Sequence, residues 1–168
     1  FREETGDQPG LRCLVQSGQM RESDREAFLE AFRQNRQDLL LGFCVMGGIF
    51  SEGIDLMGEK LIGAIIIGTG LPQIGTEREI LRQYYDKKGV NGFDYAYRYP
   101  GMNKVLQSAG RVIRTQEDTG IILLLDERFA GKDYRNLFPA EWSDRGNCTL
   151  NTVEEQLGSF WNRTREKD

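Results

Sequence analysis

The chain of 168 residues contains no histidine and only three cysteines, at positions 13, 44 and 148. The cysteines lie far apart, and none is part of a Cys-x-x-Cys pair. Histidine and clustered cysteine are the usual ligands of zinc and iron–sulfur centres, so we expect no such centre built from this chain alone. Scattered, odd-numbered cysteines fit a reducing cytosol, and Cys13 and Cys44 are expected to be small core residues of strand-like runs.

Long apolar runs are also missing. The longest one, Leu61–Ile67, contains a glycine and is far shorter than the roughly 20 residues that a membrane-spanning helix needs. The first six residues, Phe-Arg-Glu-Glu-Thr-Gly, do not have the pattern of a secretory signal. We therefore expect a soluble, cytoplasmic, globular protein without membrane contact.

The chain has no excess of positive charge, because its net charge is −4. Dedicated nucleic-acid modules are usually basic, so the bulk charge argues weakly against tight binding of nucleic acid by this chain alone. A local basic groove remains compatible with this composition.

A phosphate-binding loop is absent as well. The nearest fragment to Gly-x-x-x-x-Gly-Lys-Ser/Thr is 131–133, Gly-Lys-Asp, which lacks the hydroxyl and the upstream glycine. The segment 121–127, Ile-Ile-Leu-Leu-Leu-Asp-Glu, is similar to a magnesium-binding strand end. Without a phosphate loop we interpret it as structural, with Asp126 paired to Arg128 and Phe129 packed on the sheet. The chain is therefore not a complete ATPase.

Strand-like and helix-like segments alternate along the chain. Apolar runs predict strands over 12–16, 39–46, 61–68 and 121–125, and apolar periodicity predicts helices over 23–35, 76–88, 102–114 and 152–162. Two capping boxes are predicted, Ser23 with Glu26 and Thr76 with Glu79. Apolar strands with helices between them predict a parallel α/β sheet flanked by helices. We expect one domain over 1–168, with its core at about 11–142, a C-terminal helical tail at 143–168, and no strand before Arg12.

Two arginines and a glutamine form the most informative pattern. Gln107, Arg111 and Arg114 are spaced i, i+4 and i+7, which places them on one face of a helix. Gly110 leaves the backbone open beside Arg111. Paired guanidinium groups are well suited to binding phosphate oxygens. A solvated arginine pair on a helix face is the alternative.

A second segment, 47–56, reads Gly-Gly-Ile-Phe-Ser-Glu-Gly-Ile-Asp-Leu. Within it, Ser-Glu-Gly-Ile-Asp at 51–55, together with Gln-x-x-Gly-Arg-x-Ile-Arg at 107–114, resembles motifs V and VI of superfamily 2 helicases, and more narrowly those of the XPD/DinG family of 5′-to-3′ DNA helicases. The resemblance covers roughly residues 11–142. It implies a RecA-like fold, the second motor domain of an ATP-dependent DNA helicase, and a role in DNA repair. A non-catalytic RecA-like module that binds nucleic acid or protein is the alternative.

The resemblance also implies roles for individual residues. Arg111 and Arg114 would act as arginine fingers on the γ-phosphate of ATP, and Gln107 would hydrogen-bond phosphate or the attacking water. Further contacts would be with nucleotide (Gly53, Asp55 and Gly110) and with the DNA backbone (Ser51 and Ser17). For both serines, an ordinary turn or loop role is the alternative.

The implied partners are single-stranded DNA and the N-terminal RecA-like domain of the same parent chain, which would hold most of the ATP and its Mg²⁺. An iron–sulfur cluster is possible in that parent but not in this chain. Six aromatic residues, Tyr84, Tyr85, Phe93, Tyr95, Tyr97 and Tyr99, are predicted to lie mostly in the core, with stacking on unpaired bases as the alternative.

Overall fold

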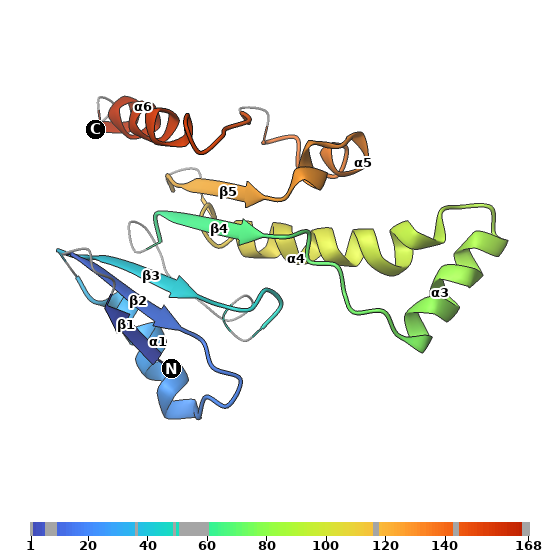
Figure 1. Cartoon of the computed structure of the whole chain (residues 1–168), viewed down its shortest axis with the longest axis horizontal. Coiled ribbons are helices and arrows are strands. Elements are labelled where there is room, and N and C mark those ends of the chain that lie inside the picture. The colour runs from blue at the N-terminus through green and yellow to red at the C-terminus, as the bar shows by residue number, and fades with distance from the viewer. Residues whose placement is uncertain are drawn as a thin grey trace. The chain divides into compact units, whose positions relative to one another are not determined.

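The computed structural model describes residues 2–5, 10–35, 37–48, 50, 61–115, 118–142 and 145–165 (Figure 1). The chain forms two compact units, Phe1–Ala130 and Gly131–Asp168. The first contains β1 (Arg2–Thr5), β2 (Leu11–Val15), α1 (Glu22–Arg33), β3 (Leu39–Phe43), β4 (Gly63–Ile67), α3 (Thr76–Lys87), the π-helix η2 (Asp94–Arg98), α4 (Tyr99–Ala109), β5 (Ile121–Leu125) and the 3-10 helix η3 (Glu127–Ala130). The second contains α5 (Lys132–Arg135) and α6 (Val153–Arg165).

The described strands form two hydrogen-bonded groups. β2 pairs in parallel with β3, and β4 pairs in parallel with β5. These parallel pairs, with helices between them in the chain, confirm the predicted α/β class. The expectation of no strand before Arg12 was wrong, because β1 pairs antiparallel with β2. Its sequence, Arg-Glu-Glu-Thr, has no apolar run to indicate a strand, but the ladder needs only backbone groups.

The first hydrophobic core lies between α1 and the strands β2 and β3. Phe28 of α1 is fully buried and its ring stacks on that of Phe50, with the centroids 4.3 Å apart. Leu14 of β2 belongs to the same cluster. A Cβ atom on Gly42 would lie 2.7 Å from the Phe32 ring, so the helix packs closely on β3. This core therefore also fixes Phe50, the residue directly before Ser51.

Both predicted capping boxes were wrong. Helix α1 begins at Glu22 and has Arg21 at its N-cap, where the Arg21 backbone N–H donates to Asp24 Oδ2 at 3.1 Å. Helix α3 has Gly75 at its N-cap, with no side-chain cap. The Glu79 carboxylate instead binds a tertiary partner, the hydroxyl of Tyr97. In the first helix the cap lies two residues earlier than predicted and uses Asp24 in place of Glu26, and in the second the predicted carboxylate binds a different donor.

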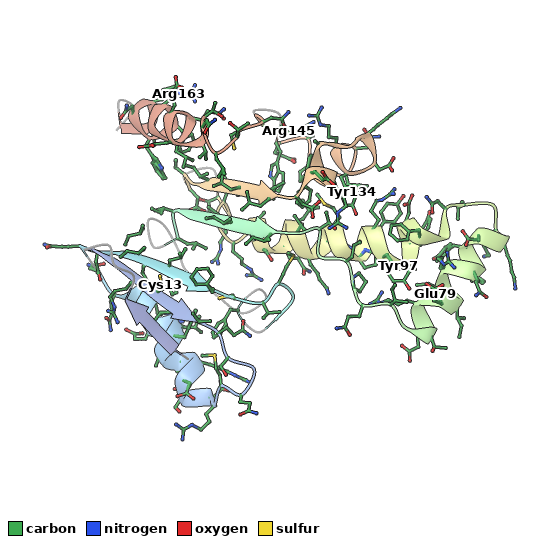
Figure 2. All side chains as sticks on the ribbon, in the orientation of Figure 1. Cys13, Glu79, Tyr97, Tyr134, Arg145 and Arg163 are labelled. Atoms are coloured by element: carbon green, nitrogen blue, oxygen red, sulfur yellow. The ribbon has the colours of Figure 1, made fainter. Side chains whose placement is uncertain are left out.

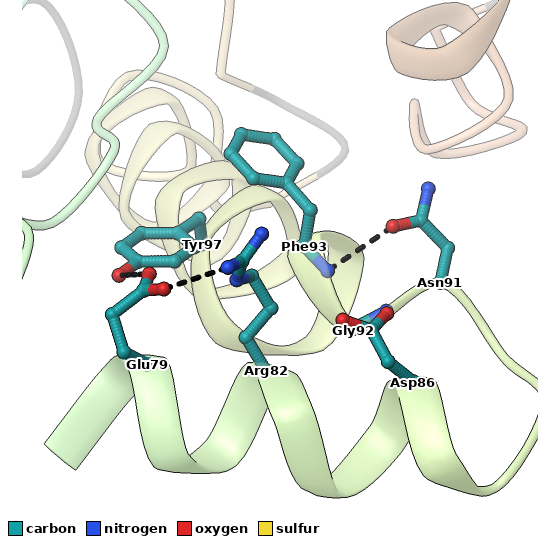
Figure 3. Close-up of polar contacts among 7 residues, drawn as sticks. All are labelled: Glu79, Arg82, Asp86, Asn91, Gly92, Phe93 and Tyr97. Atoms are coloured by element: carbon teal, nitrogen blue, oxygen red, sulfur yellow. Dashed lines mark hydrogen bonds and ion pairs between the residues drawn. The ribbon is translucent and has the colours of Figure 1, made fainter.

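The hairpin of α3, η2 and α4 is held together by polar side chains (Figures 2 and 3). The Tyr97 hydroxyl donates to Glu79 Oε1 at 2.6 Å, and Arg82 Nη2 lies 2.9 Å from Glu79 Oε2. Nearer the tip, the Gly92 backbone N–H donates to Asp86 Oδ1 at 2.8 Å. The bond to Glu79 raises the pKa of the Tyr97 phenol. These contacts fix α3 against η2, which continues directly into α4.

The aromatic residues of this hairpin are only partly in the core. Tyr97 is buried, as predicted, whereas Tyr84, Phe93 and Tyr95 are exposed, contrary to the prediction. The exposed rings pack against less exposed rings of the same hairpin: Tyr95 stacks on the half-buried Tyr85 with centroids 4.1 Å apart. A cluster of aromatic residues in the sequence is compatible both with packing on the surface of a hairpin and with packing in the core. The sequence alone therefore does not distinguish the two arrangements.

The prediction that Cys13 and Cys44 are core residues was partly right for Cys13 and wrong for Cys44. Cys13 of β2 is half-buried, but Cys44 lies just after the end of β3 and is exposed. The predicted strand ran to residue 46, whereas β3 ends at Phe43. Among the described residues, no helix is long and apolar enough to cross a membrane.

Candidate nucleotide and nucleic-acid site

The loops that follow β2 and β3 are fastened together at the carboxyl ends of the strands. Gln16 follows β2, and its Oε1 accepts the Val45 backbone N–H at 2.8 Å. Val45 also opens a tight turn, in which the Gly48 N–H donates to the Val45 carbonyl at 3.0 Å. Gly47 takes φ +76° in this turn, a conformation that strongly favours glycine. The turn leads through Phe50 into motif V.

Ser17 lies in the same β2 loop and is exposed, and its Oγ accepts the Gln19 backbone N–H at 3.4 Å. The neighbouring Gln16 side chain instead holds the turn after β3. Gln16 is therefore a positioning residue that sequence analysis missed, because its amide bonds across 29 positions of the chain. The role predicted for Ser17 at the DNA backbone stays a prediction.

The loop after β4 contacts both the β3 loop and the start of α4. A Cβ atom on Gly70, which has φ +65°, would lie 3.1 Å from Met46 Sδ and 2.7 Å from the Gly101 carbonyl oxygen. The carboxyl-end loops of three parallel-paired strands thus meet beside the first turn of α4. Ligands of open α/β sheets bind at this edge.

Helix α4 is displaced from its predicted position. It runs from Tyr99 to Ala109 with Pro100 in its first turn, and Gly110 is its C-cap. The prediction of 102–114 was therefore wrong at both ends. Proline is well suited to the first helical turn. Gly110 and the β-branched Val112 and Ile113 favour a helix end.

Arg111 and Arg114 consequently lie beyond the helix, and the predicted common helix face with Gln107 does not form. Gln107 is exposed in the last turn of α4, whereas both arginines are half-buried in the segment that follows. The Val112 N–H donates to the Ala109 carbonyl at 3.0 Å, and Val112 itself is buried. Burying Val112 turns the chain toward β5 and carries the two arginines into a loop.

A carboxylate closes this arginine loop. Asp118 Oδ2 accepts the backbone N–H groups of Arg114 and Thr115, at 2.9 and 2.8 Å. These two bonds, that of Arg114 first, hold the pKa of Asp118 below its usual range. The backbone at Arg114 is thus set by Asp118. Sequence analysis missed this role, although Asp-Thr-Gly at 118–120 has the composition of a turn.

The structure thus brings Gln107, Gly110, Arg111 and Arg114 together in one stretch, from the last turn of α4 into the loop before β5. Three further predicted site residues, Ser51, Gly53 and Asp55, lie outside the described residues, as does Glu52. Within the described ranges, no three acidic or cysteine residues gather in a way that could hold a metal ion.

The local pairing expected at the strand end 126–129 is present. Arg128 forms a bidentate pair with Asp126, with nitrogen–oxygen distances of 2.8 and 2.7 Å. This pair lowers the pKa of Asp126. Phe129 is buried.

Residues 2–145 match the family described as helicase C-terminal domain. The chain belongs to this family. The match includes the arginine loop (111–114) and the glycine turn before motif V. It confirms the family that the sequence motifs predicted. The helicase C-terminal domain is 32% identical over 123 residues to the ATP-dependent DNA helicase DinG of Photobacterium profundum, covering 72% of this chain and 17% of that protein.

Two eukaryotic relatives show the breadth of the family. The domain is 33% identical over 102 residues to the general transcription and DNA repair factor IIH helicase subunit XPD of Dictyostelium discoideum, covering 58% of this chain and 13% of that protein. It is 32% identical over 129 residues to the regulator of telomere elongation helicase 1 homolog of Caenorhabditis elegans, covering 67% of this chain and 13% of that protein. The helicase C-terminal domain therefore spans less than a fifth of the length of these curated relatives.

Asp118→Asn is expected to loosen the arginine loop of the helicase C-terminal domain. The amide keeps an acceptor oxygen but loses the charge that strengthens both bonds. Hydrogen exchange of the Arg114 and Thr115 amides should accelerate by about three- to tenfold. Because the folded pKa of Asp118 is depressed, the wild-type protection is present at neutral pH and disappears as the pH falls through that value.

The Gly92 amide, bound to Asp86 Oδ1, serves as an internal control and should exchange at the same rate in both proteins. Unchanged exchange at Arg114 and Thr115 in Asp118→Asn would contradict the capping role of Asp118.

Proposed function

We propose that this chain forms the second RecA-like motor domain of an ATP-dependent DNA helicase that moves 5′ to 3′ on single-stranded DNA and acts in DNA repair. The observation that carries the proposal is the half-buried arginine loop at 111–114, beside the end of α4, in a chain of this family. The names of both relatives contain the word helicase, that of DinG adds DNA, and that of XPD adds DNA repair, which supports the proposed substrate and process.

In this proposal the two arginines act on the nucleotide. Arg111 and Arg114 stabilise the charge that develops on the γ-phosphate during hydrolysis, and Gln107 binds phosphate or the attacking water. Mg²⁺ and most of the ATP are held by the first RecA-like domain of the parent chain. Gly53, Asp55 and Gly110 then complete the nucleotide side, and Ser51 and Ser17 contact DNA.

The test is the ATP turnover of the full-length protein with and without single-stranded DNA. A motor couples the two ligands, so we expect turnover to rise at least about tenfold when DNA is added, since coupling between sites is typically 5- to 150-fold. Turnover that is absent, or unchanged by DNA, would reject the motor and favour the alternative of a RecA-like binding module.

A further inference from the structure

One cation of this domain has an unusual position. Lys104 of α4 lies across the glycine turn that follows β3 (Val45–Gly48). Its Cδ and Cε atoms are 3.2 Å from the point that a Cβ atom on Gly47 would occupy, and its Nζ is 3.6 Å from it. The lysine stem therefore takes the space that the missing side chain of Gly47 leaves, and its ammonium is beside the turn.

The ammonium of Lys104 has no acidic partner among the described residues. Half-buried arginines of the same hairpin have acceptors, since Arg82 pairs with Glu79, Arg98 pairs with Asp94, and Arg78 donates to the Ala96 carbonyl at 2.9 Å. Lys104 is itself only half-exposed. A bound anion would replace the hydration that such a partly buried cation has lost.

The turn beside Lys104 is held in place from several sides. Gly47 and Gly48 carry no side chains of their own; the Lys104 stem covers the Cβ side of Gly47, and the Val45 carbonyl oxygen lies 2.9 Å from the point of a Cβ atom on Gly48. Gln16 fixes the turn from the other side through the Val45 N–H, and its Nε2 lies 3.4 Å from the point of a Cβ atom on Gly48. A charged group and a fixed, glycine-lined turn thus stand together at the carboxyl edge of the strands, three residues before Gln107.

We propose that Lys104 and the glycine turn form a phosphate-binding site in addition to the arginine loop. Because the proposal rests on the proposed function, the phosphate belongs either to the backbone of single-stranded DNA or to the nucleotide. Lys104 supplies a point charge, and its stem, seated on Gly47, holds that charge beside the fixed turn. Lys104 lies on α4, the helix that precedes the two arginines, and the glycine turn precedes motif V in the sequence.

The experiment measures equilibrium binding in the full-length protein, so that it does not depend on ATP turnover. Lys104→Met keeps most of the stem on Gly47 and removes the charge, and Lys104→Arg keeps the charge. Lys87→Met, an exposed lysine at the end of α3, is the matched control. Each protein is titrated with fluorescent oligo-dT at salt concentrations between about 50 and 200 mM, and separately with a fluorescent, non-hydrolysable ATP analogue.

If the site takes a DNA phosphate, Lys104→Met should weaken oligo-dT binding about tenfold and reduce the slope of log K against log salt by about 0.7. Binding of the ATP analogue should then be unchanged. If the site takes a nucleotide phosphate, the analogue should bind about tenfold more weakly and the salt slope for DNA should stay constant. In both cases Lys104→Arg and Lys87→Met should bind like wild type.

Unchanged affinity for both ligands in Lys104→Met would overturn the proposal. Equal losses in Lys87→Met would overturn it too, because they would show a general effect of charge. Failure of the motor itself is a separate result, because it appears as wild-type ATP turnover that does not respond to DNA.

Discussion

Arg114→Ala is expected to lower the DNA-stimulated ATP turnover of the full-length protein by about a thousandfold or more. An arginine finger acts on charge that appears only in the transition state, so its removal lowers kcat far more than nucleotide affinity. Arg114 is half-buried and its backbone N–H is bound by Asp118. The backbone from which the guanidinium extends is therefore fixed by Asp118.

Arg135→Ala provides the control, because Arg135 is an exposed arginine on the short helix α5, and it should leave turnover unchanged. Arg111→Ala made in parallel shows whether one arginine or both act on the phosphate. Turnover within a factor of two or three of wild type in both Arg111→Ala and Arg114→Ala would reject the arginine-finger assignment. A fall that comes with loss of structure would be visible as a lower unfolding midpoint.

Phe28→Ala is expected to lower the free energy of unfolding by about 3–5 kcal/mol. The Phe28 ring is fully buried and is stacked on Phe50 at a centroid distance of 4.3 Å. The substitution would leave a cavity between α1 and the strands, and it would remove the aromatic partner that holds Phe50. Because Phe50 directly precedes motif V, the loss should also weaken DNA-stimulated ATP turnover.

Phe43→Ala is the matched control, since Phe43 is the same residue type at the end of β3 but is 50% exposed. Hydrogen exchange followed by mass spectrometry on peptides from 11–43 measures the loss in both variants within the full-length protein. We expect protection of these peptides to fall strongly in Phe28→Ala and much less in Phe43→Ala. If these peptides were protected from hydrogen exchange equally in Phe28→Ala and wild type, the Phe28 ring would not be important for the stability of this core.

The central strands were predictable because their signal is local and strong. The predicted strand 121–125 has the same bounds as β5. The alternation of apolar runs with segments of helical periodicity indicates the α/β class. β1 was not predictable, because the ladder with β2 comes from backbone groups and Arg-Glu-Glu-Thr has no apolar pattern. The capping boxes failed because α1 is capped two residues earlier, with Arg21 and Asp24, and because Glu79 binds the Tyr97 hydroxyl.

The site shows the same division. The chemistry of the residues at 107–114 was readable from the sequence and led to the confirmed family, but their geometry was not. The spacing of Gln107, Arg111 and Arg114 indicates a helix face only if the helix continues, and Gly110 with the burial of Val112 ends it. Gln16 and Asp118 were missed because a positioning role depends on which backbone groups lie nearby, and the first of these contacts spans 29 positions of the chain.

The close contact between Gly70 and Gly101 makes α4 a lever. Its first turn touches the loop after β4 with no side chain between the two backbones, so any displacement of that loop is passed directly to the helix. α4 is 11 residues long, which corresponds to a stiff rod of roughly 16 Å. At its far end the rod carries Gln107 and the attachment point of the arginine loop. We therefore expect a displacement of the loop after β4 to move the attachment point of the arginine loop together with the helix.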